Sequence, residues 1–139
     1  MLFIFDLDGT TINSSHRQNT LADGTLNLAD WIENNTPEKI ARDSLLPLAA
    51  DMKTINRKAH DIVIMTARVL QEADYNFLLG NGLFCDKIYS RRLGDSSPDG
   101  ELKTRMILKC ARDLSRSLAW MRSNAYMFDD SNEVKKALQ

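Results

Sequence analysis

The chain has 139 residues, 43% of them hydrophobic, and a net charge of −1. A chain of roughly 150 residues buries about 68–70% of its unfolded surface, so we expect a single domain over residues 1–139 with its own core. The near-zero charge excludes a broad surface that coats nucleic acid or membrane through surplus Lys and Arg. Fourteen of the 19 acidic residues are Asp, a residue type suited to turns, caps and sites.

Four short apolar segments predict buried parallel strands. They are Leu2–Phe5, Ile62–Met65, Lys87–Tyr89 and Ala125–Phe128. The first begins at the N-terminus but meets Asp6 after only five residues and follows no basic region, so it is neither a signal peptide nor a membrane span. Cys85 and Cys110 match no metal-binding spacing, which favours a reduced protein of the cytoplasm.

The segment 10–60 separates the first two strands by more than a crossover requires, and it predicts an inserted flap and small helical lid. Asp23-Gly24 suggests a hairpin, Thr36-Pro37 a helix start, and Pro47 the start of another helix. Within this segment we expect His16 to be an exposed flap histidine and Trp31 to pack in the lid.

Two amphipathic helices are expected after the second and third strands. The first covers residues 69–79 and ends at Gly80-Asn81-Gly82. The second is a single long helix with apolar residues at spacings of three or four. These residues are Leu102, Met106, Cys110, Leu114, Leu118 and Met121. The alternation of strands and helices predicts an α/β fold, a Rossmann-like three-layer sandwich with a parallel sheet.

The sharpest local signal is Asp6-Leu7-Asp8-Gly9-Thr10, directly after the first strand. Ligands of open parallel sheets bind outside the carboxyl ends of the strands. If the strand continues to Asp8, both carboxylates lie on one side, where they repel each other unless a cation lies between them or one is protonated. The alternative is an Asp-rich turn that closes the strand.

Asp129-Asp130 follows the fourth strand in the same way, so a second pair of acids reaches the same edge of the sheet. Oxygen ligands without a cluster of His or Cys favour Mg²⁺ over zinc or copper. Taken alone, this pair would more often cap a helix. Together with Asp6 and Asp8 it predicts a magnesium site formed by Asp6, Asp8, Asp129 and Asp130.

Phosphate-binding groups are predicted at the other strand ends. Thr66 and Arg68 follow the second strand, Arg91 follows the third, and Lys103 lies near the start of the long helix. Hydroxyl, guanidinium and ammonium donors suit the charge that spreads over phosphoryl oxygens during transfer. The alternatives are a helix cap for Thr66 and a solvated helix position for Lys103.

In their order along the chain, these residues resemble the four motifs of the haloacid dehalogenase superfamily of phosphotransferases. The resemblance implies that Asp6 attacks phosphorus to form an aspartyl-phosphate, and that Asp8 protonates the leaving alcohol and then activates water. It also implies that Asp6, the backbone carbonyl of Asp8 and Asp129 hold Mg²⁺ with Asp130 close by. Thr66 and Lys103 would then bind phosphoryl oxygens.

A narrower resemblance connects the chain to the 3′-phosphatase domains of bacteriophage polynucleotide kinases. It lies in Thr66-Ala67-Arg68 and in the order Arg91, Gly94-Asp95, Asp99, Lys103. It implies that Arg68 and Arg91 contact substrate phosphate. A kinase activity is not predicted, because the chain has no Gly-x-x-x-x-Gly-Lys-Ser/Thr pattern.

The leading hypothesis is therefore a Mg²⁺-dependent phosphomonoesterase acting on 3′-phosphates of nucleic-acid ends or nucleotides, in the host cytoplasm if a phage encodes it. The alternatives are a 5′-nucleotidase or deoxyribonucleotidase acting on free mononucleotides, and a catalytically silent phosphate-binding module. Because the chain ends soon after the fourth motif, the sheet edge is expected to be either short or completed by a second copy in a homo-oligomer.

Overall fold

The computed structural model describes residues 1–17, 33–34 and 36–130. Its centre is a parallel four-stranded sheet in the order β5-β4-β1-β6. The strands are β1 (Leu2–Phe5), β4 (Asp61–Thr66), β5 (Lys87–Ser90) and β6 (Ala125–Phe128). All four predicted strands are confirmed, with β4 and β5 slightly longer than the apolar segments that predicted them.

Strand β1 lies between β4 and β6, and the register of both pairs is fixed. Leu2 lies opposite Asp61 and Ala125, and Phe5 lies opposite Ile64 and Phe128. The carboxyl ends of the three strands therefore finish side by side. In an open parallel sheet this edge is where a site forms.

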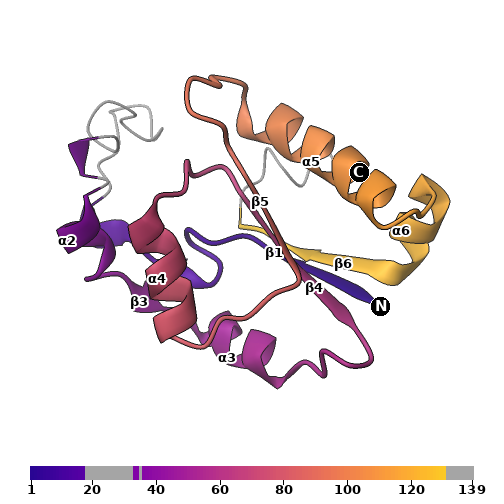
Figure 1. The fold of residues 1–139 in the computed structure, drawn as a ribbon, viewed down its shortest axis with the longest axis horizontal. Coiled ribbons are helices and arrows are strands. Elements are labelled where there is room, and N and C mark those ends of the chain that lie inside the picture. The colour runs from indigo at the N-terminus through magenta and orange to yellow at the C-terminus, as the bar shows by residue number, and fades with distance from the viewer. Residues whose placement is uncertain (18–32, 35, 131–139) are drawn as a thin grey trace.

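Helices cover both faces of the sheet, as Figure 1 shows, and the predicted three-layer α/β fold is confirmed. Helices α3 (Pro47–Thr54) and α4 (Glu72–Gly80) pack on one face, and α5 (Asp99–Asp113) and α6 (Leu118–Asn124) pack on the other. Alternating residues of β1 divide between the two cores: Leu2 and Ile4 face α5 and α6, whereas Phe5 faces α3 and α4. This alternation is the period of two that a strand imposes.

The insertion between β1 and β4 holds a second, two-stranded sheet. Its described elements are β2 (Ile12–Asn13), the 3-10 helix η1 (Ser15–Arg17), α2 (Pro37–Ile40), β3 (Ser44–Leu45) and α3. Strands β2 and β3 pair antiparallel. Thr36 caps α2 with Pro37 at its first position, and Pro47 opens α3, so both predicted helix starts are confirmed. The predicted hairpin at Asp23-Gly24 and the packing of Trp31 lie outside the described residues.

The crossover helix begins later than predicted, at Glu72 instead of Val69. Gln71 and Asp74 form a reciprocal capping box: each side chain accepts a hydrogen bond from the other residue's backbone N–H. The residues between Thr66 and Gln71 therefore form a loop. As expected, the helix ends before Gly82, which adopts φ +72°.

The prediction of one long helix to Met121 is wrong. Helix α5 ends at Asp113, and Ser115 adopts a left-handed backbone with φ +53°. The amides of Ser115 and Arg116 donate to the carbonyls of Arg112 and Ala111, which is the Schellman pattern of a helix end. Ser117 then caps α6 by accepting a hydrogen bond from the Trp120 amide. The apolar spacing continues across the break because both helices pack on the same face of the sheet.

Strands β5 and β6 are the two edges of the described sheet. Completion of the β6 edge by a second copy stays a prediction. None of the helices in the described part of the chain has the length and apolar character needed to cross a membrane.

Candidate active site

The turn after β1 separates the two carboxylates of the first motif. Asp6 still pairs with the sheet, because its amide donates to the Phe128 carbonyl over 3.0 Å. Then the Leu7 carbonyl accepts the amides of Thr10, Thr11 and Ile12, while Gly9 adopts φ +78°. The strand thus ends at Phe5 and does not continue to Asp8, so the condition for placing both carboxylates on one side is not met. The two side chains contact different cations.

Lys103 binds Asp6 from the first turns of α5. Its ammonium lies 2.8 Å from Asp6 Oδ1 and also donates to Asp129 Oδ2, and its side chain is only 2% exposed. Burial alone would lower the pKa of Lys103, but the negative charges of Asp6 and Asp129 outweigh that effect and raise it. Lys103 is therefore charged and buried among carboxylates, and the alternative of a solvated helix residue is wrong.

The Asp6 carboxyl group has an unusual proton affinity in the absence of metal. Burial raises its pKa from 3.8 to about 7; Lys103 acts in the opposite direction, and Asp129 and Asp8 add repulsion. A carboxyl group that is costly to ionise indicates a place where further positive charge would be stabilising.

Three carboxylates come close enough to share a cation. Oxygens of Asp6, Asp129 and Asp130 lie within 4.8 Å of one another. Oxygen donors of this kind are the ligands that Mg²⁺ prefers. Gly9 makes room for this cluster, because a Cβ atom at its position would lie 2.2 Å from Asp130 Oδ2. The donor set fits the predicted magnesium site, with the side chain of Asp8 outside it.

Asp8 instead pairs with Arg68. The Arg68 guanidinium donates to both Asp8 carboxylate oxygens, with Nε 3.1 Å from Oδ2 and Nη2 bound to Oδ1. The Ser14 hydroxyl donates to Asp8 Oδ1 over 2.6 Å. Burial alone would lower the pKa of Arg68, but Asp8 and then Asp74 raise it above the ordinary value. This pair fixes the orientation of the Asp8 carboxylate.

Thr66 lies at the end of β4 and is 1% exposed. Its hydroxyl accepts a hydrogen bond from the Arg68 amide over 3.0 Å. The alternative of a cap for the next helix is wrong, because Gln71 is the N-cap of α4. The hydroxyl of Thr66 thus lies at the same sheet edge as Asp6, where its own hydrogen remains for another acceptor.

Arg91 holds the loop between β5 and α5 in place. Its Nε donates to the Ala67 carbonyl over 2.8 Å, and Nη1 donates to the carbonyls of Asp95 and Ser97. Its Nη2 donates to Asp99 Oδ1 over 2.9 Å. These contacts tie the loop to the end of β4. A direct contact between Arg91 and substrate phosphate stays a prediction, as does one from Arg68.

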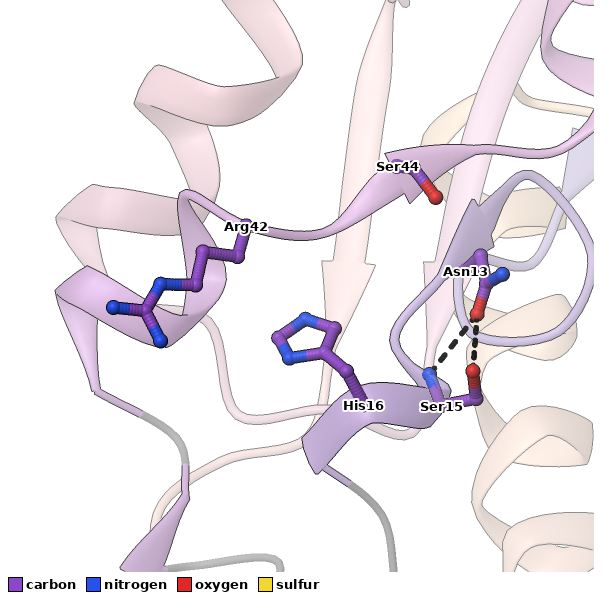
Figure 2. A pocket seen from close by; sticks show the side chains of 5 residues that line it. All are labelled: Asn13, Ser15, His16, Arg42 and Ser44. Atoms are coloured by element: carbon purple, nitrogen blue, oxygen red, sulfur yellow. Dashed lines mark hydrogen bonds between the residues drawn. The ribbon is translucent and has the colours of Figure 1, made fainter.

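An open pocket of about 490 Å³ lies on the insertion. Figure 2 shows its lining residues, Asn13, Ser15, His16, Arg42 and Ser44. His16 is exposed, as expected, and its Nε2 atom also lies 2.8 Å from Asp43 Oδ1. The Arg42 guanidinium points away from His16. The pocket is thus lined by polar side chains, one of which, His16, contacts the buried Asp43.

Comparison with known proteins places the chain in a family. The family model for bacteriophage T5 5′-deoxynucleotidase matches residues 1–115. The chain belongs to the bacteriophage T5 5′-deoxynucleotidase family. A 5′-deoxynucleotidase of Escherichia phage T5 is 38% identical over 86 residues, which are 59% of this chain and 35% of that relative. The chain thus spans about a third of the length of that curated relative.

Two solved structures share the fold. A chain in the structure of the Pnkp1/Rnl/Hen1 RNA repair complex matches with a TM-score of 0.64 at 18% identity. The match covers 97% of this chain and 37% of that chain. A second Pnkp1/Rnl/Hen1 complex matches 96% of this chain and 40% of its own with a TM-score of 0.66 at 20% identity. At these identities the likeness concerns the fold.

The deoxynucleotidase family match contains Asp6, Asp8, Arg68 and Lys103 but ends before Asp129 and Asp130. It also contains two residues that sequence reasoning missed, Asp43 and Asp74, whose carboxylates both contact Arg68. Asp74 had a local signal, the Gln71 capping box three residues earlier. Asp43 had none, because its role depends on a contact 25 residues away in the chain.

Proposed function

We propose that the protein is a phosphomonoesterase that removes the phosphate from deoxynucleoside 5′-monophosphates through an aspartyl-phosphate on Asp6. The observation that carries the proposal is the buried Asp6 carboxylate, held 2.8 Å from Lys103 and within 4.8 Å of the Asp129 and Asp130 oxygens. Membership of a deoxynucleotidase family favours a free 5′-mononucleotide over the 3′-phosphorylated end that the sequence motifs suggested.

In this proposal one oxygen of Asp6 attacks phosphorus as the bond from phosphorus to the sugar oxygen breaks. Asp8 must carry a proton when the substrate binds; it gives that proton to the departing oxygen and becomes a carboxylate as the nucleoside is released. Asp8 then takes a proton from water, whose oxygen attacks the phosphoryl group and returns Asp6 as a carboxylate. Arg68 and Ser14, which bind Asp8, hold it in one orientation for both transfers.

Lys103 and Thr66 bind the phosphoryl oxygens in the proposal. An ammonium has three N–H donors, and Asp6 and Asp129 take two of them among the described residues. Mg²⁺ held by Asp6, the backbone carbonyl of Asp8, Asp129 and the neighbouring Asp130 would supply positive charge next to the phosphoryl oxygens. Lys103 also reduces the repulsion between Asp6 and Asp129 when a dianionic substrate arrives.

The test is phosphate release from matched substrates with Mg²⁺ and with a chelator. We expect release from deoxynucleoside 5′-monophosphates, dependence on added Mg²⁺, and little release from the corresponding 3′-monophosphates. Greater rates on 3′-phosphorylated oligonucleotides would overturn the proposed substrate while retaining the phosphatase. Absence of release from every phosphomonoester would favour the silent binding module.

A second candidate function is removal of 3′-phosphates from nucleic-acid ends. The observations that favour it are the Arg68 and Arg91 motifs and the shared fold with chains of an RNA repair complex. Against it, four hydrogen bonds from each guanidinium already go to acceptors within the protein.

The similarity to a phage protein supports the proposal that the enzyme acts in the host cytoplasm.

A further inference from the structure

A chain of charged contacts runs from the insertion to the proposed acid–base residue. His16 contacts Asp43 Oδ1 at 2.8 Å, and Asp43 Oδ2 lies 3.5 Å from Arg68 Nη2. The same Nη2 atom binds Asp8 Oδ1. Asp43 precedes β3 in the insertion, whereas Asp8 lies in the turn after β1 and Arg68 follows β4. Three separate parts of the fold therefore meet at one guanidinium.

Three of the four side chains at this meeting point are buried. The side chains of Arg68, Asp43 and Asp74 are 1%, 0% and 1% exposed, whereas Asp8 is 23% exposed. Water screens such buried charges much less than surface charges, so each carboxylate contributes to where the guanidinium rests. Of these four side chains, Asp8 is the one that still reaches solvent, and so the one that can reach a substrate.

The two inner carboxylates hold Arg68 from different sides. Asp74 binds Nη1 and also accepts the Gln71 amide over 2.8 Å, which anchors it to the start of α4. Asp43 faces Nη2 and is itself held by His16. A guanidinium is a planar fork, so fixing both of its Nη atoms also fixes the plane in which Nε and Nη2 grip Asp8.

We propose that Asp43 is a positioning residue of the phosphatase reaction, which acts through Arg68 to hold Asp8 in line with the leaving-group oxygen. This inference rests on the proposed function, because it assigns Asp43 to the same acid–base step. Through Asp43, the insertion contributes to the orientation of Asp8. In this arrangement Nε and Nη2 of the Arg68 guanidinium face Asp8.

The choice of leaving group separates positioning from a merely structural role. A nucleoside leaves as an alcohol and needs a proton from Asp8, whereas p-nitrophenolate is a stable anion and leaves without one. The parameter kcat/KM reports the steps up to transfer onto Asp6, before the hydrolysis that both substrates share. A misplaced Asp8 should therefore penalise the nucleotide more than p-nitrophenyl phosphate.

The experiment compares Asp43→Asn with the unaltered protein on a deoxynucleoside 5′-monophosphate and on p-nitrophenyl phosphate, both with Mg²⁺. We expect kcat/KM for the nucleotide to fall by about tenfold or more relative to kcat/KM for p-nitrophenyl phosphate. Asp8→Asn provides the reference for complete loss of the proton donor. Asp51→Asn is the matched control, because Asp51 is an exposed residue of α3.

A double substitution tests whether Asp43 acts through Asp8. If it does, adding Asp43→Asn to Asp8→Asn should produce no further loss on the nucleotide. Asp43→Glu keeps the charge but moves the carboxylate, and we expect a smaller loss with the same preference for p-nitrophenyl phosphate. If Asp43→Asn shows no cooperative unfolding on heating and is therefore not properly folded, Asp43→Glu takes its place in the comparison.

The outcomes distinguish the two proposals. If the unaltered protein hydrolyses neither substrate, the proposed function fails. If the unaltered protein is active and Asp8→Asn shows the leaving-group preference, but Asp43→Asn lowers both rates equally or neither, the positioning role of Asp43 is refuted and the proposed function stands.

Discussion

Lys103 and Arg68 lie among buried carboxylates at the same edge of the sheet, yet they hold their partners in different ways. Lys103 reaches from α5 and touches Asp6 and Asp129 through a single ammonium. Arg68 uses a planar fork on Asp8, with Asp74 and Asp43 behind it. An ammonium is a compact point charge that can share itself with an arriving anion, whereas a held fork fixes a direction. We call Lys103 with Asp6, Asp129 and Asp130 the Lys103 half of the site, and Arg68 with Asp8, Asp43 and Asp74 the Arg68 half. The Lys103 half is suited to a charge that changes when a substrate arrives, and the Arg68 half is suited to holding one geometry.

The strongest way to break the Lys103 half is Asp6→Asn. The amide has the shape of the carboxylate but cannot form the phosphoryl ester, so we expect phosphate release to fall by about 10³-fold or more. Phosphate release from a deoxynucleoside 5′-monophosphate measures it. The melting temperature should not fall, since Asn removes a costly buried charge. Activity close to that of the unaltered protein would exclude Asp6 as the nucleophile.

Removing each cation in turn compares the stability of the two halves. Lys103→Met and Arg68→Met each leave buried carboxylates without their partner, which costs about 3–5 kcal/mol of unfolding free energy. Urea denaturation measures both losses. We expect added Mg²⁺ to recover part of the loss for Lys103→Met only, because Asp6, Asp129 and Asp130 cluster in that half. Equal recovery in both variants would contradict the division.

The two halves should also differ in their response to pH. Burial raises the pKa of Asp6 to about 7, from 3.8 in an exposed chain. The folded protein therefore holds a proton that the unfolded chain has lost, and folding stability falls as the pH rises from about 4 to about 7. Urea denaturation in chelator across this range measures the fall. Asp6→Asn is the control and should remove this component; an unchanged slope in that variant would assign it elsewhere.

The smallest change expected is at Gly9. Alanine would place its Cβ 2.2 Å from Asp130 Oδ2 and would have to adopt φ +78°. We expect a loss of about 1–3 kcal/mol in stability from the strained backbone. The Mg²⁺ concentration needed for half-maximal activity should rise as Asp130 is displaced. The leaving-group preference, which belongs to the Arg68 half, should stay as it is.

Sequence reasoning located the Lys103 half more completely than the Arg68 half, for a physical reason. Asp6 and Asp129 follow apolar strands directly, and parallel strands bring their ends together, so local patterns are enough to bring these acids to the same place. Asp43 comes from an insertion without a periodic pattern of apolar residues, and its contact with Arg68 forms only when the chain has packed. Similarly, the spacing of three or four between apolar residues continues through Leu114 and does not reveal the left-handed turn at Ser115. Such a spacing shows which face of a helix is buried, but not where its backbone hydrogen bonds end.

The position of β1 inside the sheet has a consequence for how the protein is made. During synthesis β1 emerges before β4, with which it pairs, and its other edge stays unpaired until β6, whose last residue is Phe128, has been made. Asp6 and Asp129, which meet at Lys103, stand at opposite ends of the described chain. Such distant contacts form late and slowly. The group of residues around Lys103 is therefore completed only after Asp129 has been synthesised, and a shorter nascent chain carries Asp6 without its partner carboxylates.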